Sequence, residues 1–431
     1  MEIGIPSIPP TVPKRRGVVS FVLFAVLIGA PAHADYAAAW RAFEVGDHTA
    51  AVTSWLDHAQ RGDIDAQYNV GVAFESGRGV AQDPEVAASW YNKSAAHGLD
   101  WAQFRLGLLY AEGRGVAKDM GQAMSWWRRA AKQSHAESCY QLGLAYERGD
   151  GVPNDPGLAA HWYRLAADRG LSEAQFNLAR LHHASRGIAH DLGQAWSWYR
   201  SAAEAGFAPA QNNLAYFFEH GLYVARDLER AAHWYRLAAR QGYPLAQTNL
   251  GILLNYGRGS EKNLDEATKW YRAAARQGDA WGQVNLATMI ANGLGTDKDF
   301  ALAHAWFTLA TESETDVRSS ADESLQRLES LMVPEEFSRA EVLIEELRLS
   351  INSVDDENRR VPPRRTDEFG RLTLTIQRHL ADQGYYQGAV DGIPGPATAA
   401  AIKAFQRRVG LPESGKASRP LVQALTDAAA D

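Results

Sequence analysis

A tryptophan that returns every 36 residues constrains this chain more than any other feature. The tryptophans are Trp90, Trp126, Trp162, Trp198, Trp234, Trp270 and Trp306. Each is followed by a second aromatic residue, namely Tyr91, Trp127, Tyr163, Tyr199, Tyr235, Tyr271 or Phe307. An acid usually stands seven residues before the tryptophan, with Asn263 as the exception. A period between 20 and 50 residues is typical of tandem repeats that stack into a solenoid.

A single repeat, residues 65–98, shows which structure this pattern predicts. The first helix has an apolar face made of Ala66, Val70, Gly71 and Phe74. Gly77 ends that helix, because glycine accepts the left-handed conformation that helix ends often need. Asp83 is placed to cap the second helix, and Pro84 fits the first helical position. The second helix then packs through Ala87, Trp90, Tyr91 and Ala95.

These residues, with the loop Gly77-Arg78-Gly79-Val80, resemble the Sel-one-like repeat, a relative of the tetratricopeptide repeat. The resemblance implies an all-α fold, an α-solenoid of 36-residue helix-turn-helix repeats. We assign residues 35–310 to the solenoid, with a degenerate first unit at 35–64 and seven full units. In the degenerate unit Asp47 is in frame with Asp83, whereas Trp55 comes one place later than the tryptophan period requires.

Two loops depart from the repeat pattern. Tyr223 replaces the second loop glycine of one unit, and His182-His183-Ala184-Ser185 replaces the usual loop entry of another. Because these residues accept a left-handed backbone less readily than glycine does, we expect these two turns to differ in shape from the others.

Composition excludes several classes of function. A formal net charge of -7 argues against a nucleic-acid surface, which requires a basic face. The single cysteine, Cys139, excludes an internal disulfide framework and a zinc site built on several cysteines. Cys139 occupies a helical position where other repeats carry glutamine, so we interpret it as a packing residue.

Residues 1–34 have the pattern of a secretory signal peptide. Three basic residues, 14–16, precede a short apolar run, and Ala32-His33-Ala34 resembles a signal-peptidase site. The run of about 13 residues is shorter than the roughly 20 that span a membrane. We therefore expect a mature chain that begins at Asp35, lacks a stable transmembrane segment and resides in the periplasm; an uncleaved anchor is the alternative.

The candidate partner-binding residues form an amide column on the first helices. The column consists of Asn69, Asn177, Asn213, Asn249 and Asn285, with Arg105 and Gln141 at the same place in the other two repeats. Amide side chains offer donors and an acceptor and can pair with the backbone of an extended peptide. The alternative is that these side chains bond to each other, to a neighbouring helix or to water.

No catalytic motif stands out, and we predict neither an enzyme nor a cofactor. The densest histidine cluster is His182, His183 and His190, which lacks a clear set of partner ligands, so no metal site is predicted.

The chain after the solenoid is divided into three parts. Residues 311–350 are expected to form capping helices, and the charged, proline-containing stretch 351–366 a linker. Residues 367–431 resemble the small three-helix peptidoglycan-binding domain in Gly384-Tyr385-Tyr386, Val390-Asp391-Gly392, Ala401-Ile402 and Phe405-Gln406. We name four candidate peptidoglycan-binding residues, Tyr385, Tyr386, Asp391 and Thr398. Each could instead serve the domain's own fold.

Together these features predict an exported, non-enzymatic scaffold. Its solenoid would bind a protein partner, and its C-terminal domain would dock on peptidoglycan. The alternative is an accessory or regulatory subunit that recruits a cell-wall hydrolase. A glycan hydrolase with an unrecognised site is the weakest hypothesis.

Overall fold

The computed structural model describes residues 45–313, 317–360 and 396–409, together with scattered positions near residue 40 and within 376–425. Every regular element in these ranges is an α-helix, which confirms the predicted fold class. The chain divides into two compact units, residues 1–166 and 167–431. The signal-peptide prediction and Asp391 lie outside the described residues.

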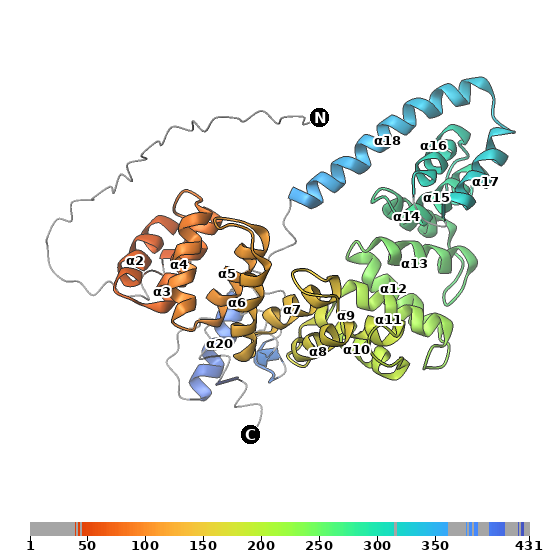
Figure 1. The fold of residues 1–431 in the computed structure, drawn as a ribbon. Coiled ribbons are helices and arrows are strands. Elements are labelled where there is room, and N and C mark those ends of the chain that lie inside the picture. Colours follow the sequence, from red (N-terminus) through yellow and green to blue (C-terminus); the bar gives the residue numbers. More distant parts are fainter. Residues whose placement is uncertain are drawn as a thin grey trace, which may run out of the picture. The chain divides into compact units, whose positions relative to one another are not determined.

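Pairs of helices follow one another along the chain, one pair for each 36-residue period (Figure 1). The first helices are α3 (Ile64–Ser76), α5 (Asp100–Glu112), α7 (Ala136–Arg148), α9 (Ser172–Ala184), α11 (Ala208–His220), α13 (Pro244–Tyr256) and α15 (Ala280–Asn292). The second helices are α2 (His48–Gln60), α4 (Pro84–Ala96), α6 (Met120–Lys132), α8 (Pro156–Ala167), α10 (Leu192–Glu204), α12 (Leu228–Arg240), α14 (Leu264–Ala275) and α16 (Phe300–Thr311).

The predicted acid caps the second helix in every repeat. Asp83 accepts hydrogen bonds from the backbone N–H groups of Glu85 and Val86, and Asn263 caps α14 in the same way. The equivalent caps are Asp47, Asp119, Asp155, Asp191, Asp227 and Asp299. Each cap satisfies an N–H group that the helix itself leaves unpaired, so the acid of the repeat marks where the second helix begins.

The residue after the periodic tryptophan is buried in every repeat. Tyr91, Tyr163 and Tyr235 have no exposed surface, whereas Trp90 and most of the periodic tryptophans are only half-buried. Trp55 is buried and stands 36 residues before Tyr91, so it occupies the place of the second aromatic residue. Trp55 comes one place after the tryptophan period because it fills the position of the second aromatic residue, while Ser54 stands at the tryptophan position.

The two unusual loops keep the shape of the others, contrary to our expectation. Ser185 stands where other repeats have the first loop glycine and has φ 54°, and Tyr223 stands at the second glycine with φ 63°. The Tyr223 ring packs beside Gly193, whose missing side chain leaves room for it. Neighbouring repeats therefore impose the left-handed turn even on residues that disfavour it.

Two further helices pack on the last repeat. They are α17 (Val317–Glu329) and α18 (Pro334–Arg360), and both contact α16. Arg339 pairs with Asp299 at 2.6 Å and Arg348 with Glu312 at 2.6 Å, near opposite ends of α16. Helix α18 continues to Arg360, within the range that we assigned to the linker.

In the C-terminal domain, the described residues form a small apolar core around α20 (Pro396–Arg408). Its buried members are Ile376, Leu380, Tyr386, Ala401, Ile402, Phe405, Leu421 and Leu425.

Candidate functional site

The candidate site is a stripe of four side chains on each first helix. Its centre is the amide-column position, and the others stand four residues before, three after and seven after it, which is one face of an α-helix. On α13 the stripe is Leu245, Asn249, Ile252 and Tyr256. We call these positions the first-helix stripe. They are half-buried or exposed, while the positions between them form the core.

All five asparagines of the amide column are half-buried. Asn249 donates from Nδ2 to Oδ1 of Asn212 in the preceding first helix at 3.1 Å, and Asn212 donates to Asn213 Oδ1 at 3.2 Å. These bonds link α11 to α13. Each amide has two donor hydrogens and an acceptor oxygen, which is more capacity than one such bond uses. The structure thus contains some of the amide-to-amide bonding weighed as an alternative, and the column stays a candidate partner site.

Acids pair with the buried tyrosines beneath the stripe. The hydroxyl groups of Tyr91, Tyr163 and Tyr235 donate to a glutamate 16 residues earlier, at 2.7, 2.7 and 2.9 Å. The glutamates are Glu75, Glu147 and Glu219. Where the aromatic residue lacks a phenol hydroxyl, as at Trp127 and Phe307, the partner position is Ala111 or Ala291. This covariation between repeats is the signal in the sequence that could have revealed the pairs.

Sequence reasoning missed one charged cluster, formed by Glu75, Tyr91, Arg105 and Arg114, which we call the Glu75 cluster. The side chain of Glu75 is only 2% exposed, and its carboxylate contacts Arg105 at 2.8 Å and Arg114 at 2.9 Å. Burial alone would raise the pKa of Glu75, but Arg105, Arg114 and the Tyr91 hydroxyl outweigh it and hold that pKa below its usual value. Burial also raises the pKa of Tyr91. Arg105 stands in the amide column, so there the column serves an internal ion pair.

In the repeat of Tyr199, where His183 stands in place of the glutamate, an amide takes part. Burial raises the pKa of Tyr199 to about 12, and a hydrogen bond with Asn213 moderates the effect.

The charge of the stripe changes along the solenoid. On α3, α5 and α7 it includes the charged residues Asp65, Arg105, Glu112, Glu137 and Arg148. On α11, α13 and α15 it includes no acid, lysine or arginine. There it is Pro209, Asn213, Tyr216, His220, Leu245, Asn249, Ile252, Tyr256, Trp281, Asn285, Thr288 and Asn292.

The candidate peptidoglycan-binding residues occupy different environments. Tyr386 is 8% exposed and belongs to the core of the C-terminal domain. Tyr385 is half-buried, and its hydroxyl accepts a hydrogen bond of 2.8 Å from Arg408. Thr398 belongs to α20. Of the described candidates, Tyr385 offers a binding surface with the least cost to the core.

Other described parts of the molecule are weaker candidates for a functional site. No group of three or more potential metal ligands occurs among the residues that the structure describes. Burial and the nearby His190 lower the pKa of His183. Cys139 is 1% exposed, as a packing residue should be.

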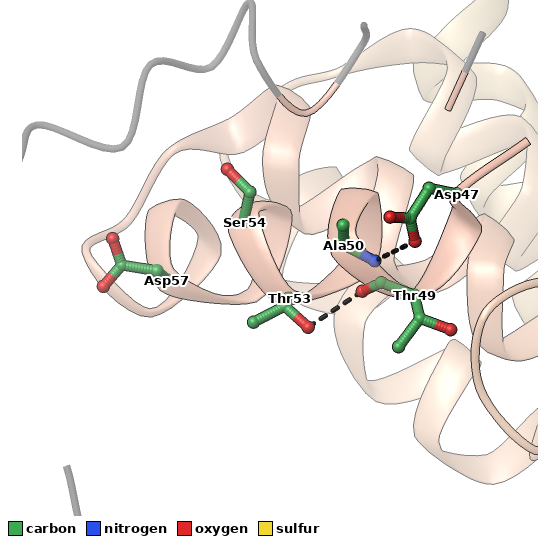
Figure 2. A pocket seen from close by; sticks show the side chains of 6 residues that line it. All are labelled: Asp47, Thr49, Ala50, Thr53, Ser54 and Asp57. Carbon is green, nitrogen blue, oxygen red and sulfur yellow. Dashed lines mark hydrogen bonds between the residues drawn. The ribbon is translucent and has the colours of Figure 1, made fainter. Parts of the chain in front are cut away.

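Figure 2 shows a shallow depression on α2, lined by Asp47, Thr49, Ala50, Thr53, Ser54 and Asp57. Asp47 is used there as the helix cap, and the Thr53 hydroxyl donates to the Thr49 carbonyl at 2.8 Å. Because the helix itself uses these polar groups, the depression offers no convergent set for a ligand.

Comparison with known families agrees with this geometry. The Sel1 repeat matches residues 64–99, 102–135, 136–171, 172–207, 208–243, 244–279 and 282–314, and the chain belongs to the Sel1 repeat family. The family described as "Putative peptidoglycan binding domain" matches residues 370–425. Sel1 repeats imply protein–protein interaction and are typically non-catalytic scaffolds, and the C-terminal match suggests peptidoglycan binding and association with the cell wall.

The chain is similar to solved structures of repeat proteins. A Sel1 repeat protein from Oxalobacter formigenes is 31% identical with a TM-score of 0.53, over 56% of this chain and 98% of that one. The antigen c5321 of uropathogenic Escherichia coli, described as displaying an SLR fold, is 26% identical with a TM-score of 0.38, over 74% of this chain and 86% of that one.

One curated protein, "Putative OxPP cycle protein OpcA" from Synechocystis sp., is 35% identical over 104 residues. That match covers 23% of this chain and 22% of OpcA, so the chain spans about a fifth of the relative's length. Within the described residues, no helix combines the length and apolar character that a membrane span requires.

Proposed function

We propose that this protein is an exported, non-enzymatic scaffold of the cell envelope, which binds a protein partner through the first-helix stripe and docks on peptidoglycan through residues 367–431. The observation that carries the proposal is the union of two binding elements in one chain: a repeat array with half-exposed amides on successive helices, and a domain that matches a peptidoglycan-binding family.

Wall docking is tested by sedimentation of the purified full chain with peptidoglycan sacculi. We expect the full chain to pellet and a chain that ends at residue 366 to stay in the supernatant. Two variants of the full chain, Tyr385→Ala and Asp391→Asn, should pellet less while their melting profiles are retained. A full chain that does not pellet refutes the docking role.

Partner binding is tested by cross-linking in periplasmic extract with the triple variant Asn177→Ala, Asn213→Ala and Asn249→Ala. Loss of the cross-linked partner at unchanged helix content supports the amide column, since amides can pair with a peptide backbone. Unchanged capture places the binding surface elsewhere. Co-purification of lytic activity with the full chain would favour the accessory subunit of a wall hydrolase, and N-terminal sequencing checks cleavage before Asp35.

A further inference from the structure

The stripe on α11, α13 and α15 exposes large apolar side chains as well as amides. Tyr216 is 41% exposed, Leu245 47%, Tyr256 69% and Trp281 46%. The stripe of α3, α5 and α7 exposes no large apolar side chain to this degree. Exposed aromatic side chains on the same face of successive repeats are characteristic of residues that anchor a partner.

The same surface lacks charge. Helices α13 and α15 contain no acidic, basic or histidine residue at all. The only acid on α11, Glu219, accepts a hydrogen bond from the buried Tyr235 hydroxyl. The cores of protein interfaces show this combination, with aromatic residues enriched and charged residues depleted.

A surface without countercharges discriminates between partners. A charged side chain pressed against Leu245, Tyr256 and Trp281 would lose its hydration and gain no ion pair, which is costly. An apolar or amide side chain meets no such penalty. The surface therefore selects for an uncharged segment.

The amides determine what form the segment takes. Asn213, Asn249 and Asn285 recur once per repeat on adjacent first helices, and the bond between Asn249 and Asn212 holds two of these helices in register. Amide groups repeated at the helix spacing can pair with the N–H and C=O groups of a chain that crosses the helices. An extended peptide presents such groups along its whole length.

We infer that the stripe of α11, α13 and α15 is the docking site for an extended peptide segment of the partner, and that this segment has no charged side chain where it contacts the stripe. The inference rests on the proposed function and specifies the partner of its site. The stripe of α3, α5 and α7 takes no part in this contact.

The test is selection of a displayed library of random twelve-residue peptides on the purified full chain. Enriched peptides should be depleted in Asp, Glu, Lys and Arg relative to the input library. One enriched peptide, labelled with a fluorophore, then serves as the probe for all variants. Failure to enrich any peptide, or enrichment of charged peptides, overturns the inference.

Matched variants locate the contact. Trp281→Ala with Tyr256→Ala should weaken probe binding by about tenfold or more, since both side chains act as anchors. The matched control is Glu137→Ala with Arg148→Ala, which changes the same repeat positions on α7 and should leave binding within about twofold. The reverse pattern, or no effect of either pair, overturns the inference while leaving the scaffold function intact.

A single exposed position tests the role of charge. Thr288 lies on the stripe of α15 and is exposed. Thr288→Glu should weaken binding of the uncharged probe by about tenfold, whereas Thr288→Gln, which has the same shape as the glutamate variant but no charge, should retain it within about twofold. Equal affinities for the two variants contradict charge selection. Binding of an N-acetylglucosamine oligomer that is lost in Trp281→Ala would assign the surface to a glycan instead.

Discussion

The first helices of the early repeats, α3, α5 and α7, and those of the later repeats, α11, α13 and α15, share one packing frame and differ in charge. In both regions the same positions are buried and the same loops turn. The early stripe carries acids and arginines, one of which, Arg105, is used internally in the Glu75 cluster. The later stripe is uncharged and exposes aromatic side chains. The repeats of one array can thus share the same core while their exposed surfaces serve different functions.

The largest difference in the cost of a substitution between the two regions should appear at the position of Glu75. Glu75→Ala removes the acid of a buried ion pair and leaves Arg105 without it, which should cost about 4 kcal/mol of unfolding free energy. Asn255→Ala changes the same repeat position in the later region and should cost about 1 kcal/mol. Urea denaturation of the full chain measures both. Equal losses would show that charge does not distinguish the two regions.

The charge of Glu75 makes the stability of the folded chain depend on pH. Because the pKa of Glu75 is lower in the folded state than its usual value, its contribution is present above the unfolded-state pKa and is lost as pH falls through the folded-state pKa. As pH falls below about 4, the stability advantage of the wild type over Glu75→Gln should therefore shrink, and it should be lost once the folded-state carboxylate is protonated. A difference in stability that does not change with pH would contradict an ionised Glu75.

Because the repeats pack in the same way, two loop glycines at the same repeat position should lose equal stability when they are substituted. Gly115 and Gly259 both have positive φ, and a Cβ atom on either would lie 2.1 or 2.0 Å from a backbone carbonyl oxygen of the preceding repeat. Alanine at either position should cost about 3 kcal/mol, from backbone strain and steric overlap together. Gly206 has positive φ with open space around it, so Gly206→Ala, with about 1 kcal/mol, isolates the strain. Thermal melting compares the three, and unequal losses at Gly115 and Gly259 would break the common frame.

Substitution of the tyrosines that pair with glutamates should show a smaller difference in stability between the two regions. Tyr91→Phe leaves the buried Glu75 without one of its donors and should cost about 2 kcal/mol. Tyr235→Phe should cost about 0.5 kcal/mol, because Glu219 is half-exposed and water can replace the lost donor. Urea denaturation measures both variants, and an equal cost would place the two acids in equivalent environments.

The sequence predicted the fold because periodicity, caps and loop glycines all act locally. Asp83, Gly77 and Tyr91 could be assigned their places from one repeat alone. The Glu75 cluster could not be assigned so easily, because Glu75 and Arg105 come from different repeats and meet only through stacking. The shapes of the loops at Ser185 and Tyr223 were mispredicted, since local preference favoured a change that packing between repeats overrides. The site residues stay a prediction.

The smallest effect concerns the one repeat that has a residue other than glutamine at a recurring buried position. In α3, α5, α9, α11, α13 and α15 a buried glutamine donates from Nε2 to a carbonyl oxygen eight residues earlier, at the end of the preceding second helix. Cys139 holds that place in α7, and the corresponding carbonyl is that of Ala131, which accepts from the backbone N–H of Ser134.

Cys139→Gln should introduce the glutamine hydrogen bond of the other repeats and raise the unfolding free energy by about 0.5–1 kcal/mol, the usual net value of one buried hydrogen bond. Cys139→Met adds comparable length without a donor and serves as the control for volume. Urea denaturation of the two variants separates the hydrogen bond from packing. If glutamine destabilises α7 as much as methionine does, the site cannot accommodate the longer side chain, and α7 differs from the other first helices in packing.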